Sequence, residues 1–402
     1  MSSFLRTGIQ ISKRDFFVII IFFFAFFEAY YFLITNFLEQ VIPSSLDIVM
    51  LQGILYFFTC IILLFGSFFI QKFSKLKIIY FCSVLNCIFS LLFLINFFEA
   101  FWLLLIFFLV LFMSLAMLTT LCVFGNLTSP EERGRIGGII GLFVFLLFFV
   151  VNFSIAPNLE FYGSVLLTFS LSFLPFIALL FKNFRIKIIP IKKMPENYYE
   201  RRVFFLYFIP WIIFSLINAT LATNTSNFII QSISDSLLFT LESLQVLGVL
   251  IGVLLGGFVA DILGRRFSLV FGLTFFGFST ALIGLFQTEI VYLIVYGASG
   301  LTWGILFVLY IFVVWGDLSN ENNRIKIYSI GLISYFLSLG VGSFVALSME
   351  IIPSAFLSVL IIFILNIPII FAPELLPSYI LERNRLRRHM GAVKKFKNKN
   401  QG

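Results

Sequence analysis

Twelve long apolar runs follow one another along this chain, most of them joined by short polar segments. A helix rises about 1.5 Å per residue, so about 20 apolar residues are needed to cross the hydrocarbon core of a bilayer. Hydrophobic residues make up 61% of the 402 residues and charged residues only 11%, against about 25% charged in a typical soluble domain. The sequence therefore predicts an all-α membrane protein with twelve transmembrane helices. The runs lie at about 15–37, 47–70, 77–96, 100–124, 136–157, 161–181, 203–223, 237–260, 268–286, 290–316, 326–348 and 352–373.

The runs fall into two sets of six that resemble a duplicated unit. The stretch Gly125–Thr128, followed by Arg133, matches Gly316–Ser319, followed by Arg324, without gaps and 191 positions apart. A basic segment with two prolines, 182–202, separates the two sets. Two parallel six-helix halves form one known transporter plan. We expect an N-terminal six-helix bundle at 1–181, a linker at 182–202, a C-terminal six-helix bundle at 203–380 and a basic tail at 381–402.

Lysine and arginine are distributed very unevenly. All 27 lie in the N-terminal segment, in the connections after the second, fourth, sixth, eighth and tenth runs, or in the tail. Because cytoplasmic connections are enriched in these residues, we expect a multi-pass protein of the cell membrane with both termini in the cytoplasm. This bias accounts for the net charge of +8, so nucleic-acid binding is not expected.

The segment after the eighth run carries the most specific motif. Gly257, Asp261, Gly264, Arg265 and Arg266 fit the pattern G-x-x-x-D-x-x-G-[RK]-[RK]. This pattern resembles the loop signature of the major facilitator superfamily, which occurs between the second and third helices and, more weakly, between the eighth and ninth. The resemblance implies two pseudo-symmetric six-helix bundles and alternating access. Asp261 is able to accept hydrogen bonds from Arg265 or from the N-terminus of a helix in the other half, and such a contact biases a two-state equilibrium.

The other connections on the same side of the membrane fit this resemblance unevenly. In the first half, Gln71 stands where the signature has its acid. The connections after the fourth and tenth runs contain Arg133, Asp317 and Arg324, which the resemblance places in a cytoplasmic gating network. Two alternatives stay open: the cations only fix the topology, or these charges are solvated loop side chains.

Two carboxyl groups lie inside the apolar runs, Glu28 in the first and Glu242 in the eighth. Intramembrane carboxyl groups are costly and mark functional sites. No lysine or arginine lies beside them, so we expect Glu28 to be protonated until water reaches it, which suits proton coupling. The alternative is a neutral acid with a structural role. Further candidates for proton or substrate binding are Asn218, Gln52, Gln245, Tyr31, Asn36 and Asn224.

Other kinds of chemistry lack the residues they need. The only histidine, His389, lies in the tail, and the sequence has no CxxC pair and no Walker loop, so no enzyme activity, metal or cofactor is expected. A buried anion needs compensating cations, which the runs lack. We therefore predict a monomeric secondary transporter for a small neutral or cationic solute such as a sugar, a polyol or a lipophilic amine, coupled to protons or to Na⁺.

Two alternatives to this function remain. One is a proton-coupled efflux antiporter for drugs or metabolites, although the fifth run has no G-P-x-x-G-G. The other is a membrane sensor of transporter descent that moves no solute.

Overall fold

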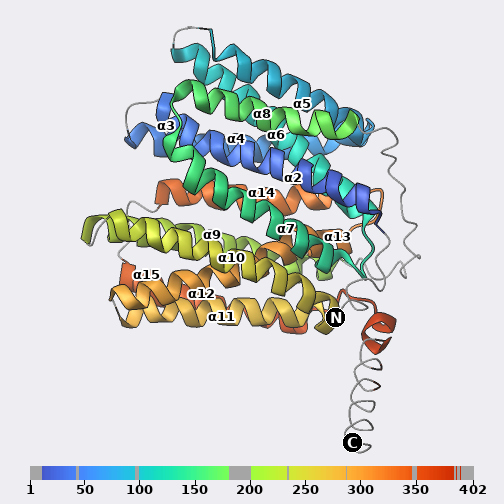
Figure 1. Ribbon diagram of the computed structural model, residues 1–402. Coiled ribbons are helices and arrows are strands. Elements are labelled where there is room, and N and C mark those ends of the chain that lie inside the picture. Colours follow the sequence, from blue (N-terminus) through green and yellow to red (C-terminus); the bar gives the residue numbers. More distant parts are fainter. Residues whose placement is uncertain are drawn as a thin grey trace, which may run out of the picture.

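The computed structural model describes residues 11–41, 45–95, 99–180, 201–232, 235–286, 288–345, 351–383, 386 and 390. All regular structure in these ranges is helical (Figure 1). A helix satisfies its own backbone hydrogen bonds, which is required where no water is present. All twelve predicted runs form helices, and this confirms the predicted fold class.

The first half contains six membrane-spanning helices, and two of them change their winding near one end. Its elements are α2 (Lys13–Phe32) continued by the π-helix η1 (Leu33–Phe37) and α3 (Leu38–Val41), then α4 (Ser45–Gln71), α5 (Lys75–Leu92), α6 (Glu99–Leu127), α7 (Arg133–Val150) continued by the π-helix η2 (Val151–Ile155) and the 3-10 helix η3 (Ala156–Asn158), and α8 (Phe161–Leu180).

The second half also contains six long helices, and one of them continues into a π-helix. Its elements are α9 (Arg201–Ser232), α10 (Asp235–Leu263), α11 (Arg265–Leu285), α12 (Glu289–Phe307) continued by the π-helix η5 (Val308–Val314) and α13 (Trp315–Asp317), then α14 (Arg324–Val345) and α15 (Ile351–Phe371). Within the described residues, eleven helical stretches are long and apolar enough to cross a membrane, and α15 is apolar over Ala355–Phe371.

The largest difference from the predicted boundaries is in α9. The sequence predicts that the seventh helix ends at 223, where polar residues begin, but α9 continues to Ser232. The end of an apolar run marks where a helix leaves the hydrocarbon, and the helix itself does not have to end there. Most of the predicted linker at 182–202 and most of the tail lie outside the described residues.

The two halves meet along two seams. Helix α4 packs against α14, and α7 packs against α10. In Figure 1 the first half, in blue and green, lies above most of the second half, and α14 lies against the first half. These seams bring residues far apart in the sequence into contact.

Six helices begin at the same end of the molecule, each with a lysine or arginine as its first residue. They are α2, α5, α7, α9, α11 and α14, which begin at Lys13, Lys75, Arg133, Arg201, Arg265 and Arg324. A cation at a helix N-terminus opposes the helix dipole. The side chains that compensate for this arrangement are described below, and we call this end of the molecule the charged end.

Glycines allow α10 to approach helices on two sides. A Cβ atom added at Gly252 would lie 2.1 Å from the carbonyl oxygen of Leu301 on α12, and one added at Gly257 would lie 2.2 Å from that of Gly134 on α7. In membranes, small residues promote helix association by allowing such close backbone contact. Gly252 therefore sets the packing inside the second half, and Gly257 sets the packing between the halves.

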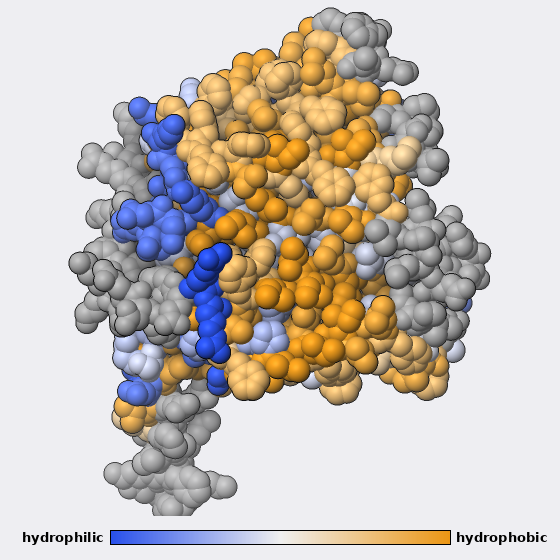
Figure 2. Space-filling model, turned by 180° about the vertical axis from the view of Figure 1, so that it is seen from behind, coloured by the Kyte–Doolittle hydropathy of each residue, from blue (hydrophilic) through white to orange (hydrophobic). Residues whose placement is uncertain are grey.

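The outer surface suits a bilayer. Figure 2 shows a broad apolar face that is bordered at one end by hydrophilic side chains. Many of the exposed side chains are phenylalanines, including Phe65, Phe278 and Phe371. The twelve helices and this surface make the chain a multi-pass membrane protein.

Candidate functional site

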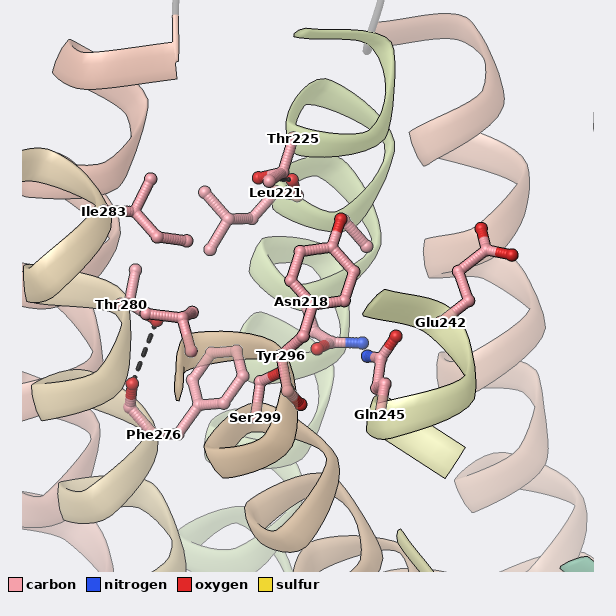
Figure 3. A pocket seen from close by; sticks show the side chains of 12 residues that line it. Asn218, Leu221, Thr225, Glu242, Gln245, Phe276, Thr280, Ile283, Tyr296 and Ser299 are labelled. Carbon is pink, nitrogen blue, oxygen red and sulfur yellow. Dashed lines mark hydrogen bonds between the residues drawn. The ribbon is translucent and has the colours of Figure 1, made fainter. Parts of the chain in front are cut away.

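A polar cavity lies inside the second half (Figure 3). It has space for about 70 Å³ of water, where one water molecule needs about 10–15 Å³. Helices α9, α10, α11 and α12 form its walls, and none of the lining residues is a lysine or arginine. The lining residues are Asn218, Leu221, Ala222, Thr225, Glu242, Gln245, Phe276, Thr280, Ile283, Val295, Tyr296 and Ser299.

Three of the predicted binding residues meet at this cavity. The carboxamides of Asn218 and Gln245 lie close to each other, while the carboxyl group of Glu242 points away from both of them (Figure 3). Glu242 is half-buried, three residues before Gln245 on α10. The amides and the hydroxyl of Ser299 offer both donors and acceptors to a solute. The side chain of Asn224, another predicted binding residue, lies outside the described part of the chain.

A second polar group, which we call the Glu28 cluster, lies inside the first half and consists of Glu28, Asn36 and Asn152. Glu28 is fully buried, and its Oε1 accepts a hydrogen bond of 2.7 Å from Nδ2 of Asn152. Oδ1 of Asn152 in turn accepts one of 3.1 Å from Nδ2 of Asn36. The second carboxyl oxygen, Oε2 of Glu28, has no hydrogen-bond partner among the described residues. The partner of this intramembrane acid is therefore an amide and not a cation.

Two π-helices carry the asparagines of the Glu28 cluster. Asn36 belongs to η1 and Asn152 to η2. A π-turn leaves the α-helical hydrogen-bond pattern and is frequent at functional sites. Nε2 of Gln52 donates a hydrogen bond of 3.0 Å to the carbonyl oxygen of Ile34 in η1. Gln52, predicted as a binding residue, therefore supports the π-turn next to the cluster.

The predicted binding residues thus come from both halves. Glu28, Asn36 and Gln52 belong to the first half, and the ring of Tyr31 packs edge-to-face on Phe148, 4.7 Å between centroids. The residues around Glu242 belong to the cavity of the second half. The sequence prediction missed Asn152, because its candidates lay on the two helices that carry the acids, on the helix that begins the second half and at Gln52, and none lay on the fifth run. Its signal was an amide within the fifth apolar run.

A layer of phenylalanine rings separates both polar groups from the charged end. Phe23 and Phe27 precede Glu28 on α2, and Phe307 and Phe312 follow Ser299 on α12 and η5. The rings of Phe23 and Phe312 meet edge-to-face with centroids 4.9 Å apart, across the boundary between the halves. This layer leaves an apolar cavity of only about 30 Å³.

Asp261 joins the two halves at the charged end. Its Oδ1 accepts a hydrogen bond of 3.1 Å from the backbone N–H of Gly134, and its Oδ2 accepts one of 2.8 Å from that of Arg135. Both N–H groups belong to the first turn of α7 in the other half. Nη1 of Arg265 lies 2.9 Å from Oδ1 of Asp261 in the same ion-pair network. The carboxylate therefore binds both partners that the sequence suggested, the following arginine and a helix N-terminus.

Asp317 holds two buried arginines from different halves. Oδ1 of Asp317 accepts a hydrogen bond from Nη1 of Arg133, and its Oδ2 accepts one of 2.9 Å from Nε of Arg265. All three residues are buried, with at most 5% of their surface exposed. They are not solvated loop charges, which corrects one of the two alternatives left open by the sequence. We call Arg133, Arg135, Asp261, Arg265, Asp317 and Arg324 the charged-end cluster.

Arg266 lies outside the charged-end cluster. Its exposed guanidinium donates to the carbonyl oxygens of Ile370 and Ala372, at 3.3 and 3.4 Å, around the end of α15. A cation beside the last carbonyl groups of a helix is favourable. Gly264 makes the turn before Arg265 with φ of +110°, a conformation that favours glycine.

Solved structures of other proteins share this arrangement of helices. The proton:xylose symporter XylE, bound to 6-bromo-6-deoxy-D-glucose, superposes with a TM-score of 0.67 at 12% identity, covering 90% of this chain and 96% of that chain. The transporter FucP, in the outward conformation, superposes with a TM-score of 0.66 at 12% identity, covering 89% of this chain and 98% of that one. No protein-family model and no curated protein matches the sequence.

This chain has the major facilitator superfamily fold. Likeness at 12% identity establishes the fold alone. It confirms two pseudo-symmetric six-helix bundles. The polar cavity is lined by helices of the second half, and the Glu28 cluster lies on helices of the first half.

Within this superfamily fold, the two seams of the charged end differ in chemistry. Arg324 is the repeat equivalent of Arg133, but its Nη1 donates to the amide oxygen of Asn126 where Arg133 has Asp317. Gln71, the equivalent of Asp261, donates 3.3 Å to the carbonyl oxygen of Asn322. The seam of α7 and α10 is therefore joined by carboxylates, and the seam of α4 and α14 by amides.

Proposed function

We propose that this protein is a secondary active transporter that moves a small neutral or cationic solute by alternating access, with protons as the coupling ion. The observation that carries the proposal is the polar cavity of the C-terminal bundle, which has amide and hydroxyl groups but no cation. Its position, enclosed by membrane-spanning helices of the superfamily fold, suits a solute in transit.

The chemistry of this cavity supports the solute class. A carboxylate or phosphate buried in the membrane needs a cation, and none of the lining residues is a lysine or arginine. A polyhydroxylated solute would exchange its hydrogen bonds with water for bonds to Asn218 and Gln245. XylE, a proton:xylose symporter of the same fold, supports this choice.

Glu28 supports the proton coupling. A fully buried carboxyl group with an unpartnered oxygen is stable in its neutral form, and hydration favours release of its proton. We propose that Glu28 binds a proton from one side and releases it when water enters from the other.

The charged-end cluster supports alternating access. Buried ion pairs hold the halves together at this end, and their hydration on separation provides the second state of a two-state equilibrium. From the distribution of lysine and arginine we assign the charged end to the cytoplasm. The cell membrane remains the proposed location, and a monomer the proposed assembly.

A flux experiment tests the proposal. The protein is reconstituted in liposomes with an imposed pH gradient, and uptake of labelled sugars, polyols and organic cations is compared with that of dicarboxylates and sugar phosphates. We expect accumulation of a neutral or cationic solute that protonophore abolishes. Preferred uptake of an anion would contradict the solute class. Solute movement against the proton flow would identify the antiporter, and no flux of any solute would favour the sensor.

A further inference from the structure

A groove at the charged end lies between α9 and α14, away from the cavity and the Glu28 cluster. It has a volume of about 330 Å³. One mouth residue, Arg201, is charged, and below it the walls are mainly apolar. The lining residues are Arg201, Phe204, Phe205, Leu318, Asn323, Ile327 and Ile330. We infer that this groove binds an anionic phospholipid, with the phosphate at Arg201 and an acyl chain between the two helices.

The exposed stripe of α9 shows that this side of the molecule faces lipid. Arg201, Phe205 and Ile209 follow one another at intervals of four residues and lie on one face of the helix. Phe205 is 40% exposed and Ile209 is 44% exposed. Apolar side chains exposed on a membrane-spanning helix contact acyl chains, so the groove beside them opens towards the bilayer.

The charge of the groove selects an anionic head group. The guanidinium carbon of Arg201 lies 5.9 Å from the ring centroid of Phe205, one turn deeper in the membrane. Arg201 makes no ion pair with any carboxylate of the described residues. None of the lining residues is an aspartate or glutamate. Among the described residues no carboxylate therefore competes with a phosphate for Arg201, and basic pockets between transmembrane helices on the cytoplasmic side bind such head groups.

The other basic residues nearby are directed elsewhere. Nζ of Lys326 lies 5.2 Å from the ring centroid of Phe68 on α4. Arg324 is buried and donates to Asn126. Arg202 does not line the groove, although it is exposed and adjacent to Arg201 in the sequence. Binding at the groove therefore depends on one arginine, and Arg202 provides a matched control.

The test measures binding of phosphatidylglycerol and phosphatidylcholine to the purified full-length protein by native mass spectrometry. We expect phosphatidylglycerol to bind more tightly, and Arg201→Gln to weaken its binding about fivefold, the value for one basic side chain near an anionic surface. Arg202→Gln should leave the affinity within twofold. Ile327→Trp, which fills the apolar part of the groove, should weaken both lipids, and a melting curve verifies that it folds.

Several results would overturn the inference. Equal loss in Arg201→Gln and Arg202→Gln would indicate a diffuse electrostatic effect. Unchanged affinity in Ile327→Trp, once folded, would place the lipid elsewhere. Displacement of the lipid by millimolar inorganic phosphate would identify a site for free anions. Lack of selective binding would leave the groove to another occupant, such as the basic segment at 182–200.

Discussion

At the scale of single residues, Glu28 is distinguished by its partner. An amide donates to one carboxyl oxygen, and the other has no hydrogen-bond partner among the residues that the structure describes. We expect Glu28→Gln to remove solute accumulation driven by a pH gradient while exchange of solute across the membrane continues. The neutral amide copies the protonated form but has no proton to release. The measurement is uptake with and without the gradient in liposomes.

Glu242→Gln is the matched control, because it makes the same change at the other intramembrane acid. Its effect should fall on solute affinity, since Glu242 lines the cavity. Uphill accumulation that persists in Glu28→Gln but disappears in Glu242→Gln would transfer the proton role to the second half.

A second prediction concerns Asp317. Asp317→Asn leaves Arg133 and Arg265 buried without their shared carboxylate, and breaking a buried ion pair costs about 3–5 kcal/mol. We expect a lower melting temperature and greater access of thiol reagents to cysteines introduced at the charged end. Asn126→Asp makes the opposite change beside Arg324 and should reduce that access. If both variants change access in the same direction, the cluster does not hold this end closed.

The sequence identified a candidate functional residue where that residue was unusual for its surroundings or completed a motif. Glu28 and Asp261 were recognised because a carboxyl group is costly in an apolar run, or because it completes a motif. Asn152 and Glu374 were not recognised. Glu374 accepts from the backbone N–H of Arg265 at 2.7 Å, a contact between positions 109 residues apart. No local pattern marks a contact that only the packing of helices creates.

At the scale of elements, the glycines of α10 determine how the cavity is built. Gln245 on α10 and Ser299 on α12 line the same cavity, and Gly252 sets the distance between these helices. We expect Gly252→Ala to destabilise the protein by about 1–3 kcal/mol through overpacking. A melting curve in detergent measures this change.

Gly297→Ala provides the control, since its Cβ would meet only the side chain of Leu244 at an ordinary 3.5 Å. Its melting temperature should match that of the wild type. Similar melting temperatures for Gly252→Ala and Gly297→Ala would show that α10 and α12 separate freely.

The elements themselves followed from hydrophobicity, but their irregular parts did not. Apolar runs located twelve helices because a bilayer requires that length. The π-helices η1, η2 and η5 left no such trace, because Leu33–Phe37 and Val308–Val314 are apolar or mixed sequences that also suit a regular helix. Their winding depends on tertiary contacts such as the one between Gln52 and Ile34.

At the scale of the whole molecule, a substitution at Gly257 should affect the closure of the two halves and leave the folding of each bundle intact. Gly257 contacts Gly134 across the seam of the two halves, so a larger residue there need not disturb either bundle. We expect Gly257→Val to keep near-normal expression and membrane insertion but to lose most transport, because the halves no longer close at the charged end. Wild-type flux in this variant would show that the segment serves only the topology.

The arrangement of twelve helices in two halves was predictable because the sequence repeats a six-helix unit. Two six-helix halves appeared in the spacing of runs and in the match of Arg133 with Arg324. The boundaries proposed for the bundles, the linker and the tail remain predictions.

The asparagine beside Glu28 also has an electrical consequence. Because Asn152 is uncharged, the site is neutral while Glu28 holds its proton and negative once the proton has left, so a cycle that carries one proton with a neutral solute moves one net positive charge. A membrane voltage of 100 mV is worth about 2.3 kcal/mol for one such charge, equivalent to about 50-fold accumulation. A potassium diffusion potential, without any pH difference, should therefore drive neutral solute across liposomes of the wild type and not of Glu28→Gln. Solute flux that does not change with this voltage would mean that a second charge, either an anion moving with the proton or a cation moving against it, makes the cycle electroneutral.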